Sequence, residues 1–122
     1  MLPNGPVVEE YLDDQGDSPF ATWFQDLDAV AAAKVTVALL RIERGATSNV
    51  KGVGEGVLEF RIDFGPGYRI YFGRDGERLV ILLAGGSKRR QDEDIVAAKA
   101  RWRRYKARKA DAARGPSAAK GQ

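Results

Sequence analysis

The sequence predicts a two-layer α+β domain in which a helical hairpin packs on a small, mainly antiparallel sheet and a C-terminal helix follows. Three patterns predict it: helical spacing of apolar residues up to about residue 44, strict alternation from residue 57 to 72, and a continuous apolar run at 79–84. A chain of 122 residues has room for one core. We expect residues 1–110 to form this single domain and residues 111–122, which gain Gly, Pro and Ser, to form a disordered tail.

The first part of the chain predicts a strand and two helices. Residues 6–13 hold apolar residues between turn formers, which indicates a strand. Ser18 is a typical N-cap with Pro19 at the first helical position, so a short helix is expected to about Leu27. Asp28 has the features of a second N-cap, and the helix that it begins should stop at Gly45.

The second part predicts three strands and a helix. A glycine-rich segment at 46–56 is expected to be a loop, and residues 57–64, 68–72 and 79–84 to form an antiparallel meander joined by tight turns. The third strand should be buried on both faces because it has no polar residue. A final helix is expected from the acids at 92–94, which suit a helix N-terminus, to about Lys109.

The composition limits the chemistry. The chain has no histidine and no cysteine, which excludes histidine-based triads and nucleases, disulfides and thiolate or histidine zinc sites. Catalysis must use carboxylates, Lys, Arg, Tyr, Ser or Thr, or an oxygen-ligated ion. No apolar run could span a bilayer, and residues 1–33 lack the basic start of a secretory signal. We therefore expect a cytoplasmic protein with no membrane partner.

Charge is distributed unevenly along the chain. Residues 1–33 carry seven acids and no bases, whereas residues 86–114 carry eleven bases and four acids, a net charge of +7. Such a block suggests a polyanion or an acidic protein as partner. The alternative is a solvated helix face.

Arginines on two adjacent predicted strands form the first candidate site. Arg61 and Arg69 should project from one side of the sheet, where two guanidinium groups can bind a phosphate. The alternative for Arg61 is a surface ion pair with Glu59 or Asp63. Tyr71 is expected on the face that carries Arg69.

Other basic residues form a second group of candidates. Lys88, Arg89 and Arg90 directly follow the buried strand, a frequent location for function, although a solvated loop is the alternative. Lys51 lies in the glycine-rich segment, which is not a P-loop because the Gly-Lys-Ser/Thr ending is missing. On the basic final helix, Trp102 and Tyr105 could stack on RNA bases, but their spacing favours core packing.

Several motifs in order resemble RelE-like toxins of toxin–antitoxin pairs, especially the HigB-like branch known as addiction-module killer proteins. They are VGEGVLEFRI at 53–62, GPGYRIYF at 65–72 and LLAGGSK at 82–88, followed by Gln91, Asp94, Ile95 and Ala98. The resemblance implies a fold shared with microbial ribonucleases, cleavage of mRNA, usually in the ribosomal A site, and neutralisation by a helix-turn-helix antitoxin.

The resemblance also assigns roles by position. Arg69 matches the arginine that binds the scissile phosphate, Arg61 a basic position on the preceding strand, and Lys88 or Arg90 a cation from the basic loop. Tyr71 joins these as a candidate proton-transfer residue. The candidate RNA-binding residues are Lys51, Arg89, Arg90 and Arg41.

The chain departs from the family pattern at three points. Glu59 stands where the best-known members have a lysine, residues 94–96 stand where they have a tyrosine, and the histidine of other members is missing. The general acid and base are therefore unassigned, with Lys51, Glu59, Lys88 and Tyr71 as alternatives.

We expect a metal-independent endoribonuclease toxin, without cofactors, that inhibits translation. The 2′-hydroxyl of RNA would attack the adjacent phosphorus, and cations would stabilise the charge on the phosphoryl oxygens. Two alternatives stay open: a non-nucleolytic member of the fold that resembles gyrase poisons, and a plain nucleic-acid-binding protein.

Overall fold

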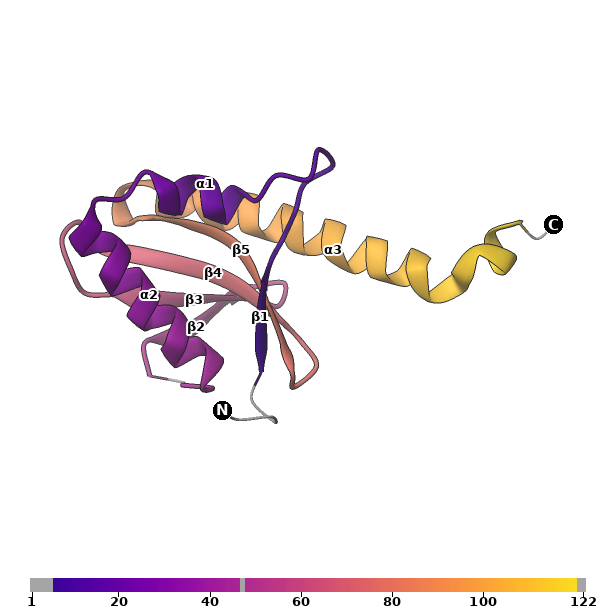
Figure 1. Ribbon diagram of the computed structural model, residues 1–122, viewed down its shortest axis with the longest axis horizontal. Coiled ribbons are helices and arrows are strands. Elements are labelled where there is room, and N and C mark those ends of the chain that lie inside the picture. Colours follow the sequence, from indigo (N-terminus) through magenta and orange to yellow (C-terminus); the bar gives the residue numbers. More distant parts are fainter. Residues whose placement is uncertain (1–5, 47, 121–122) are drawn as a thin grey trace.

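The computed structural model describes residues 6–46 and 48–120, with side chains described as far as Arg114. The strands are β1 (Val7–Glu10), β2 (Val50–Gly54), β3 (Val57–Ile62), β4 (Tyr68–Asp75) and β5 (Leu79–Ser87). The helices are α1 (Pro19–Gln25), α2 (Ala29–Glu43), the short 3₁₀ helix η1 (Lys88–Arg90) and α3 (Gln91–Lys120). The predicted α+β class and the order of its main elements are confirmed (Figure 1).

The five strands form one mixed sheet in the order β1-β5-β4-β3-β2. The predicted antiparallel meander is β3-β4-β5, while β1 pairs with β5 in parallel at one edge. The expectation of a plain loop at 46–56 was wrong, because β2 pairs with β3 at the other edge and places Lys51 opposite Glu59. Glycine-rich segments lack strand-forming side chains, so pairing with a neighbour defines this strand rather than propensity.

The helical hairpin begins and ends as its sequence predicts. The Ser18 hydroxyl accepts a hydrogen bond from the Ala21 amide at 3.0 Å, and the Asp28 carboxylate accepts one from the Ala31 amide at 2.8 Å. Gly45 ends α2 with a φ of 80°, a conformation that glycine adopts without strain. The hairpin covers one face of the sheet through a core that includes Phe20, Val35, Ala38, Ile42, Phe60, Ile70 and Phe72.

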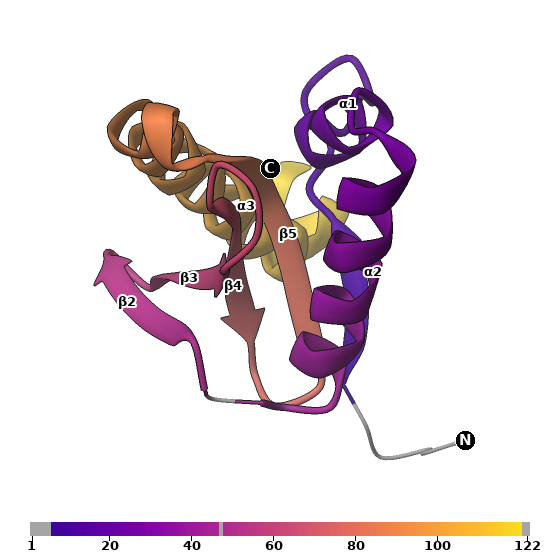
Figure 2. The same cartoon turned by 90° about the vertical axis from the view of Figure 1, so that its left-hand side faces the viewer.

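Helix α3 covers the opposite face of the sheet, so the domain has three layers rather than the two expected (Figure 2). The second core joins Ala98 and Trp102 of α3 to Val57, Tyr71, Ile81 and Leu83 of the sheet. The last turns of α3 project beyond the sheet (Figure 1).

The helix ends at Lys120 rather than near Lys109. Alanines recur beyond residue 109 and favour helix, which the glycine and proline there obscured. The domain boundary at 110 and the disordered tail at 111–122 stay predictions, and residues 121 and 122 lie outside the described part. Within the described part, no helix combines the length and apolar character that crossing a bilayer requires.

A β-bulge in β5 determines what faces α3. Tyr71 pairs with Ala84 and Phe72 with Leu82, so Leu83 is an extra residue on β5. Beyond it the alternation shifts by one, and Gly85 faces Trp23 of the hairpin while Gly86 faces Asp94 of α3. The bulge therefore places Gly86, which has no side chain, directly opposite Arg69 and beneath the start of α3.

Candidate functional site

Polar side chains gather on the α3 face of the sheet near the ends of β3, β4 and β5. Arg61 pairs directly with Arg69 across β3 and β4, and Glu59 pairs with Tyr71 in the same way. Directly opposed residues place their side chains on one side of the sheet. The expectation that Arg61 and Arg69 share a face agrees with this register.

Arg69 is not presented to solvent as a free phosphate-binding group. It is 7% exposed, and its Nε lies 3.7 Å from Oε2 of Glu59, which is 2% exposed. Glu59 also accepts a hydrogen bond from Nε2 of Gln91 at 2.9 Å, and Nζ of Lys51 lies 3.9 Å from its Oε1. Glu59 was considered as the partner of Arg61 in a surface ion pair, but it is buried at the start of α3 and pairs with Arg69.

The turn between β3 and β4 connects Arg69 to the basic loop. The carbonyl of Gly67 accepts a hydrogen bond from Nη1 of Arg69 at 2.7 Å and another from the backbone amide of Lys88 at 2.9 Å. Gly67 has a φ of 77°, and a Cβ there would lie 3.3 Å from Arg69 Nη1. The Arg69 side chain and the backbone of Lys88 therefore share one acceptor, the Gly67 carbonyl.

Three buried polar atoms in this region have no hydrogen-bond partner: Arg69 Nε, the Tyr71 hydroxyl and Asp94 Oδ2. Asp94 lies over Gly86, where a Cβ would be 1.8 Å from Oδ2. Gly86 is the residue directly opposite Arg69, so the carboxylate occupies the side-chain position beside that arginine. Buried polar atoms without partners are rare in folded proteins, and a cluster of them marks a candidate active site.

The environment shifts the pKa of two groups in this cluster. Burial, and next the negative charge of Glu59, raises the pKa of Tyr71 far above its ordinary value of 10. Burial also raises the pKa of the Asp94 carboxyl above its ordinary 3.8, against the lowering effect of Arg90. Tyr71 therefore stays protonated at neutral pH and can donate a proton but not accept one.

Exposed cations lie next to the buried cluster on β2 and η1, while Arg61 of β3 lines a pocket with Lys34 and Arg41 of α2. The Lys51 side chain is 66% exposed, and Lys88 and Arg89 are exposed and make no ion pair within the described residues. Arg61 is 54% exposed with its Nε 3.3 Å from Oδ1 of Asp63, which is the surface ion pair left open as the alternative. Arg90 pairs with Glu93 at 2.9 Å.

Arg41 is not part of this cluster. It lies on α2, on the hairpin side of the sheet, and lines a shallow pocket with Lys34 and Arg61. Of the candidate RNA-binding residues, Lys51, Arg89 and Arg90 therefore lie near the start of α3, and Arg41 lies apart from them.

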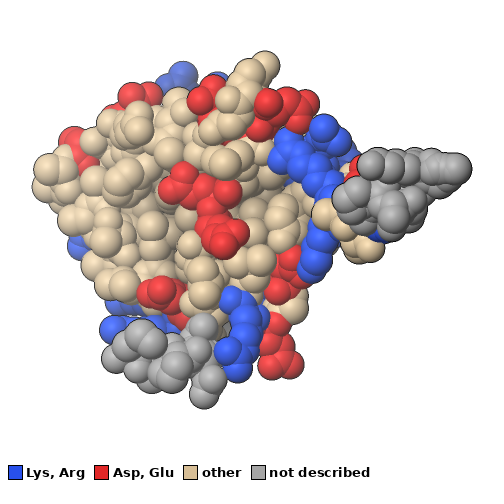
Figure 3. Space-filling model, turned by 45° about the vertical axis from the view of Figure 1, so that its right-hand side comes forward, with Lys and Arg blue, Asp and Glu red and all other residues tan. Residues whose placement is uncertain are grey.

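Most of the basic block of α3 is neutralised within the chain. Of the eleven bases at residues 86–114, six pair with carboxylates, five of them on α3 and one, Arg90, in η1. Acidic side chains lie beside basic ones on the face shown in Figure 3. The pairs are Arg90–Glu93, Arg103–Glu55, Arg104–Asp14, Arg108–Asp14, Lys109–Asp75 and Arg114–Asp111. The solvated-face interpretation fits most of this helix better than a polyanion surface.

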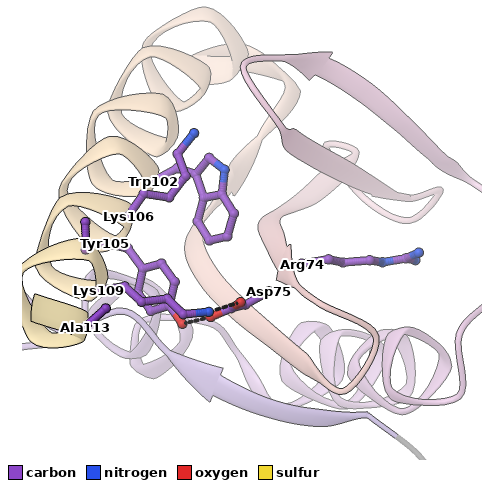
Figure 4. A pocket seen from close by; sticks show the side chains of 8 residues that line it. Arg74, Asp75, Trp102, Tyr105, Lys106, Lys109 and Ala113 are labelled. Carbon is purple, nitrogen blue, oxygen red and sulfur yellow. Dashed lines mark hydrogen bonds and ion pairs between the residues drawn. The ribbon is translucent and has the colours of Figure 1, made fainter.

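The aromatic rings of Trp102 and Tyr105 on α3 stack on each other. Trp102 is 5% exposed, and its ring lies parallel to that of Tyr105 at a centroid distance of 5.2 Å. The Tyr105 hydroxyl donates a hydrogen bond to the Asp75 carboxylate at 2.5 Å, and Lys109 pairs with the same carboxylate. These three side chains and Trp102 line a groove of about 430 Å³ (Figure 4). Core packing, the favoured interpretation, is confirmed for Trp102.

Sequence reasoning missed three members of the cluster. Glu59 was considered as a partner of Arg61, as a departure from the family pattern and as an alternative base, but not as the partner of Arg69. Gln91 and Asp94 were considered as parts of a motif, and Asp94 also as an acid at a helix N-terminus, but neither was placed in the site. A glycine inside a strand often marks the close approach of another group. Gly86 is such a residue in the structure, but the predicted strand ended at residue 84, so the sequence did not show this signal.

Comparison with known proteins identifies relatives of this chain. The model of the phage-derived Gp49-like family (DUF891) matches residues 22–113. An uncharacterized protein of Haemophilus influenzae is 42% identical over 81 residues, which cover 66% of this chain and 82% of the relative. No solved structure matches significantly.

Proposed function

Because the chain belongs to the phage-derived Gp49-like family of toxin-like addiction-module proteins, we propose that it is the toxin of a type II toxin–antitoxin system and cleaves mRNA. Cleavage during translation, in the ribosomal A site, would stop protein synthesis. The motifs at 53–62, 65–72 and 82–88, which resemble the HigB-like branch of RelE-like toxins, support the finer part of this proposal.

One observation carries the proposal: Arg69, Tyr71 and Asp94 each hold a buried polar atom that makes no hydrogen bond, on the side of the sheet that α3 covers, with exposed cations nearby. A phosphodiester needs a cation for its oxygens and proton-transfer groups for its attacking and leaving oxygens. This cluster holds an arginine, a phenol that stays protonated, and carboxylates. The exposed cations, Lys51, Lys88, Arg89 and Arg61, would bind the flanking backbone phosphates.

The proposed reaction needs no metal. The 2′-oxygen attacks the adjacent phosphorus, the bond to the 5′-oxygen breaks, and the products are a 2′,3′-cyclic phosphate and a 5′-hydroxyl. Arg69 stabilises the charge that grows on the phosphoryl oxygens, together with Arg61 and Lys88. Removing one such donor costs roughly 100- to 1,000-fold in rate.

The substrate must first open the site. Arg69 is held by Glu59 and Glu59 by Gln91, so a phosphate can contact the guanidinium only when this ion pair separates. The exposed cations can bind RNA before that happens. The RNA phosphate would then replace the Glu59 carboxylate as the partner of Arg69, so the guanidinium would have an anionic partner before and after binding.

The proposed partners follow from the same function. A cognate antitoxin with a helix-turn-helix domain would neutralise the toxin, and mRNA on the ribosome would be its target in the cytoplasm. The antitoxin would cover the Arg61 and Arg69 face or displace α3.

A second candidate is a toxin of the same fold that does not cut RNA and acts like a gyrase poison. The burial of Arg69 against Glu59 favours it, because the charge of the phosphate-binding group is already compensated. The neutralised basic block of α3 argues against the third alternative, a plain nucleic-acid-binding helix.

Induced expression in bacterial cells tests the proposal. We expect the wild type to arrest growth and primer extension to show cuts in translated mRNA, with both effects lost in Arg69→Ala. Arg44→Ala is the matched control, because Arg44 is an exposed arginine at the end of α2, on the hairpin side. Growth arrest with intact mRNA and induction of the SOS response would instead support the gyrase-poison candidate.

A further inference from the structure

We propose that Asp94 is the general base of this site and takes the proton of the attacking 2′-hydroxyl. The assignment rests on the RNA-cleaving function proposed above and names the residue that this function still lacks. Residues 94–96 stand where the best-known relatives have a tyrosine, so the resemblance does not supply this role.

Position is the first argument. The Asp94 carboxylate occupies the side-chain space of Gly86, which pairs directly with Arg69, and the next pair along these strands is Tyr71 with Ala84. Side chains at directly opposed positions have Cβ atoms about 5 Å apart. A phosphate on the Arg69 guanidinium would therefore have the carboxylate of Asp94 and the hydroxyl of Tyr71 as its neighbours.

Free lone pairs are the second argument. Glu59 is the other carboxylate of the cluster, but Arg69, Lys51 and Gln91 all contact its oxygens. Asp94 Oδ2 is buried and accepts no hydrogen bond. A base must have an open lone pair, and among the described carboxylates of this cluster Asp94 offers one.

The charges that face Asp94 are consistent with this role. Arg69 and Tyr71 lie beside it on β4 and Arg90 on η1, Glu93 and Arg101 lie on its own helix, and Gly86 of β5 adds no charge. Burial outweighs Arg90 and Arg101 and raises the pKa of Asp94 above 3.8, toward the range in which a carboxylate accepts protons effectively at neutral pH. Arg101 donates to the Leu83 carbonyl at 2.9 Å and so is committed elsewhere.

The proton balance closes within the cluster. Asp94 takes the 2′-hydroxyl proton as the 2′-oxygen bonds to phosphorus, and the Tyr71 phenol gives its proton to the departing 5′-oxygen. A proton then passes from the Asp94 carboxyl to the Tyr71 phenolate, which restores both groups. No oxidant, reductant or added reactant is needed.

The test compares Asp94→Asn with Asp92→Asn in purified full-length protein. Asp92 is an exposed acid in the same first turn of α3, so the two changes differ only in the group removed from the cluster. Cleavage of a translated reporter mRNA is measured across pH 5–8 by primer extension. We expect Asp94→Asn to slow cleavage at least about 100-fold, to remove the rise in rate as the carboxylate ionises, and to leave RNA binding unchanged, while Asp92→Asn stays within about twofold.

Thermal unfolding separates this role from a structural one. An ionised carboxylate with a raised folded-state pKa destabilises the fold at neutral pH, so Asp94→Asn should melt no lower than the wild type at pH 7. Melting well below the wild type would make Asp94 a structural residue and overturn the assignment. Cleavage by Asp94→Asn within threefold of the wild type would also overturn it and leave the RNA-cleaving function standing. A wild type that cuts no mRNA would defeat both.

Discussion

Removing the negative charge of Glu59 should destabilise the fold strongly, because the buried guanidinium of Arg69 would lose the carboxylate with which it forms an ion pair. The Glu59 side chain is 2% exposed and that of Arg69 8%. Breaking a buried ion pair by removing one partner costs about 3–5 kcal/mol. Glu59→Gln keeps the shape and an acceptor for Gln91, and Arg69 keeps its bond to the Gly67 carbonyl, so the lower end applies.

We therefore expect Glu59→Gln to lower the free energy of unfolding by about 3 kcal/mol, which is a drop of roughly 10 °C in Tm for a domain of this size. Asp63→Asn is the matched control: it removes the partner of Arg61 in an exposed pair, which should cost at most about 1 kcal/mol. Urea unfolding followed by tryptophan fluorescence measures both.

The double variant Glu59→Gln with Arg69→Met removes both charges. It should be more stable than Glu59→Gln alone, since an apolar side chain needs no counter-ion. The reasoning is refuted if Glu59→Gln costs less than about 0.5 kcal/mol, the range of ordinary surface changes, or if the double variant is the less stable of the two.

Three further outcomes test the packing of α3 and its ion pairs. Trp102→Ala should cost about 3–5 kcal/mol in chemical unfolding, because its ring fills the second core; Val96→Ala, at a site 67% exposed, should cost under about 0.5 kcal/mol. Gly86→Ala should cost about 1–3 kcal/mol, because its Cβ would displace the Asp94 carboxylate, and equal stability to the wild type would contradict that contact. Hydrogen bonds from Lys109 and Tyr105 lower the pKa of Asp75, so the ionised carboxylate should stabilise the fold fully above pH 3.8 and progressively less below it. The difference in stability between the wild type and Asp75→Asn should therefore shrink between pH 5 and pH 3. A difference that stays constant over this range would contradict the prediction.

Local sequence signals predicted the elements that local interactions determine. The caps at Ser18 and Asp28, the stop at Gly45 and the alternation in β3 and β4 each reflect contacts within a few residues along the chain. Strand β2 was missed because its glycines carry no such signal and its pairing with β3 defines it.

The candidate site could be predicted only in part, for the same reason. Alternation placed Arg61, Arg69 and Tyr71 on one face, and the register agrees. It could not show that α3 crosses that face and buries Arg69 against Glu59, because that contact joins residues far apart in the sequence. The bulge at Leu83 turns Gly86 toward Asp94, and a bulge changes the face without changing the residue types.

The central claim is that this chain cuts translated mRNA with Arg69 at the reacting phosphate. Its most direct test is a reconstituted translation reaction with purified protein, in which the ends of the cleaved reporter mRNA are mapped chemically. We expect 2′,3′-cyclic phosphate and 5′-hydroxyl ends with the wild type and a rate about 100- to 1,000-fold lower with Arg69→Ala. Intact mRNA with the wild type, or equal cleavage by Arg69→Ala, would contradict it.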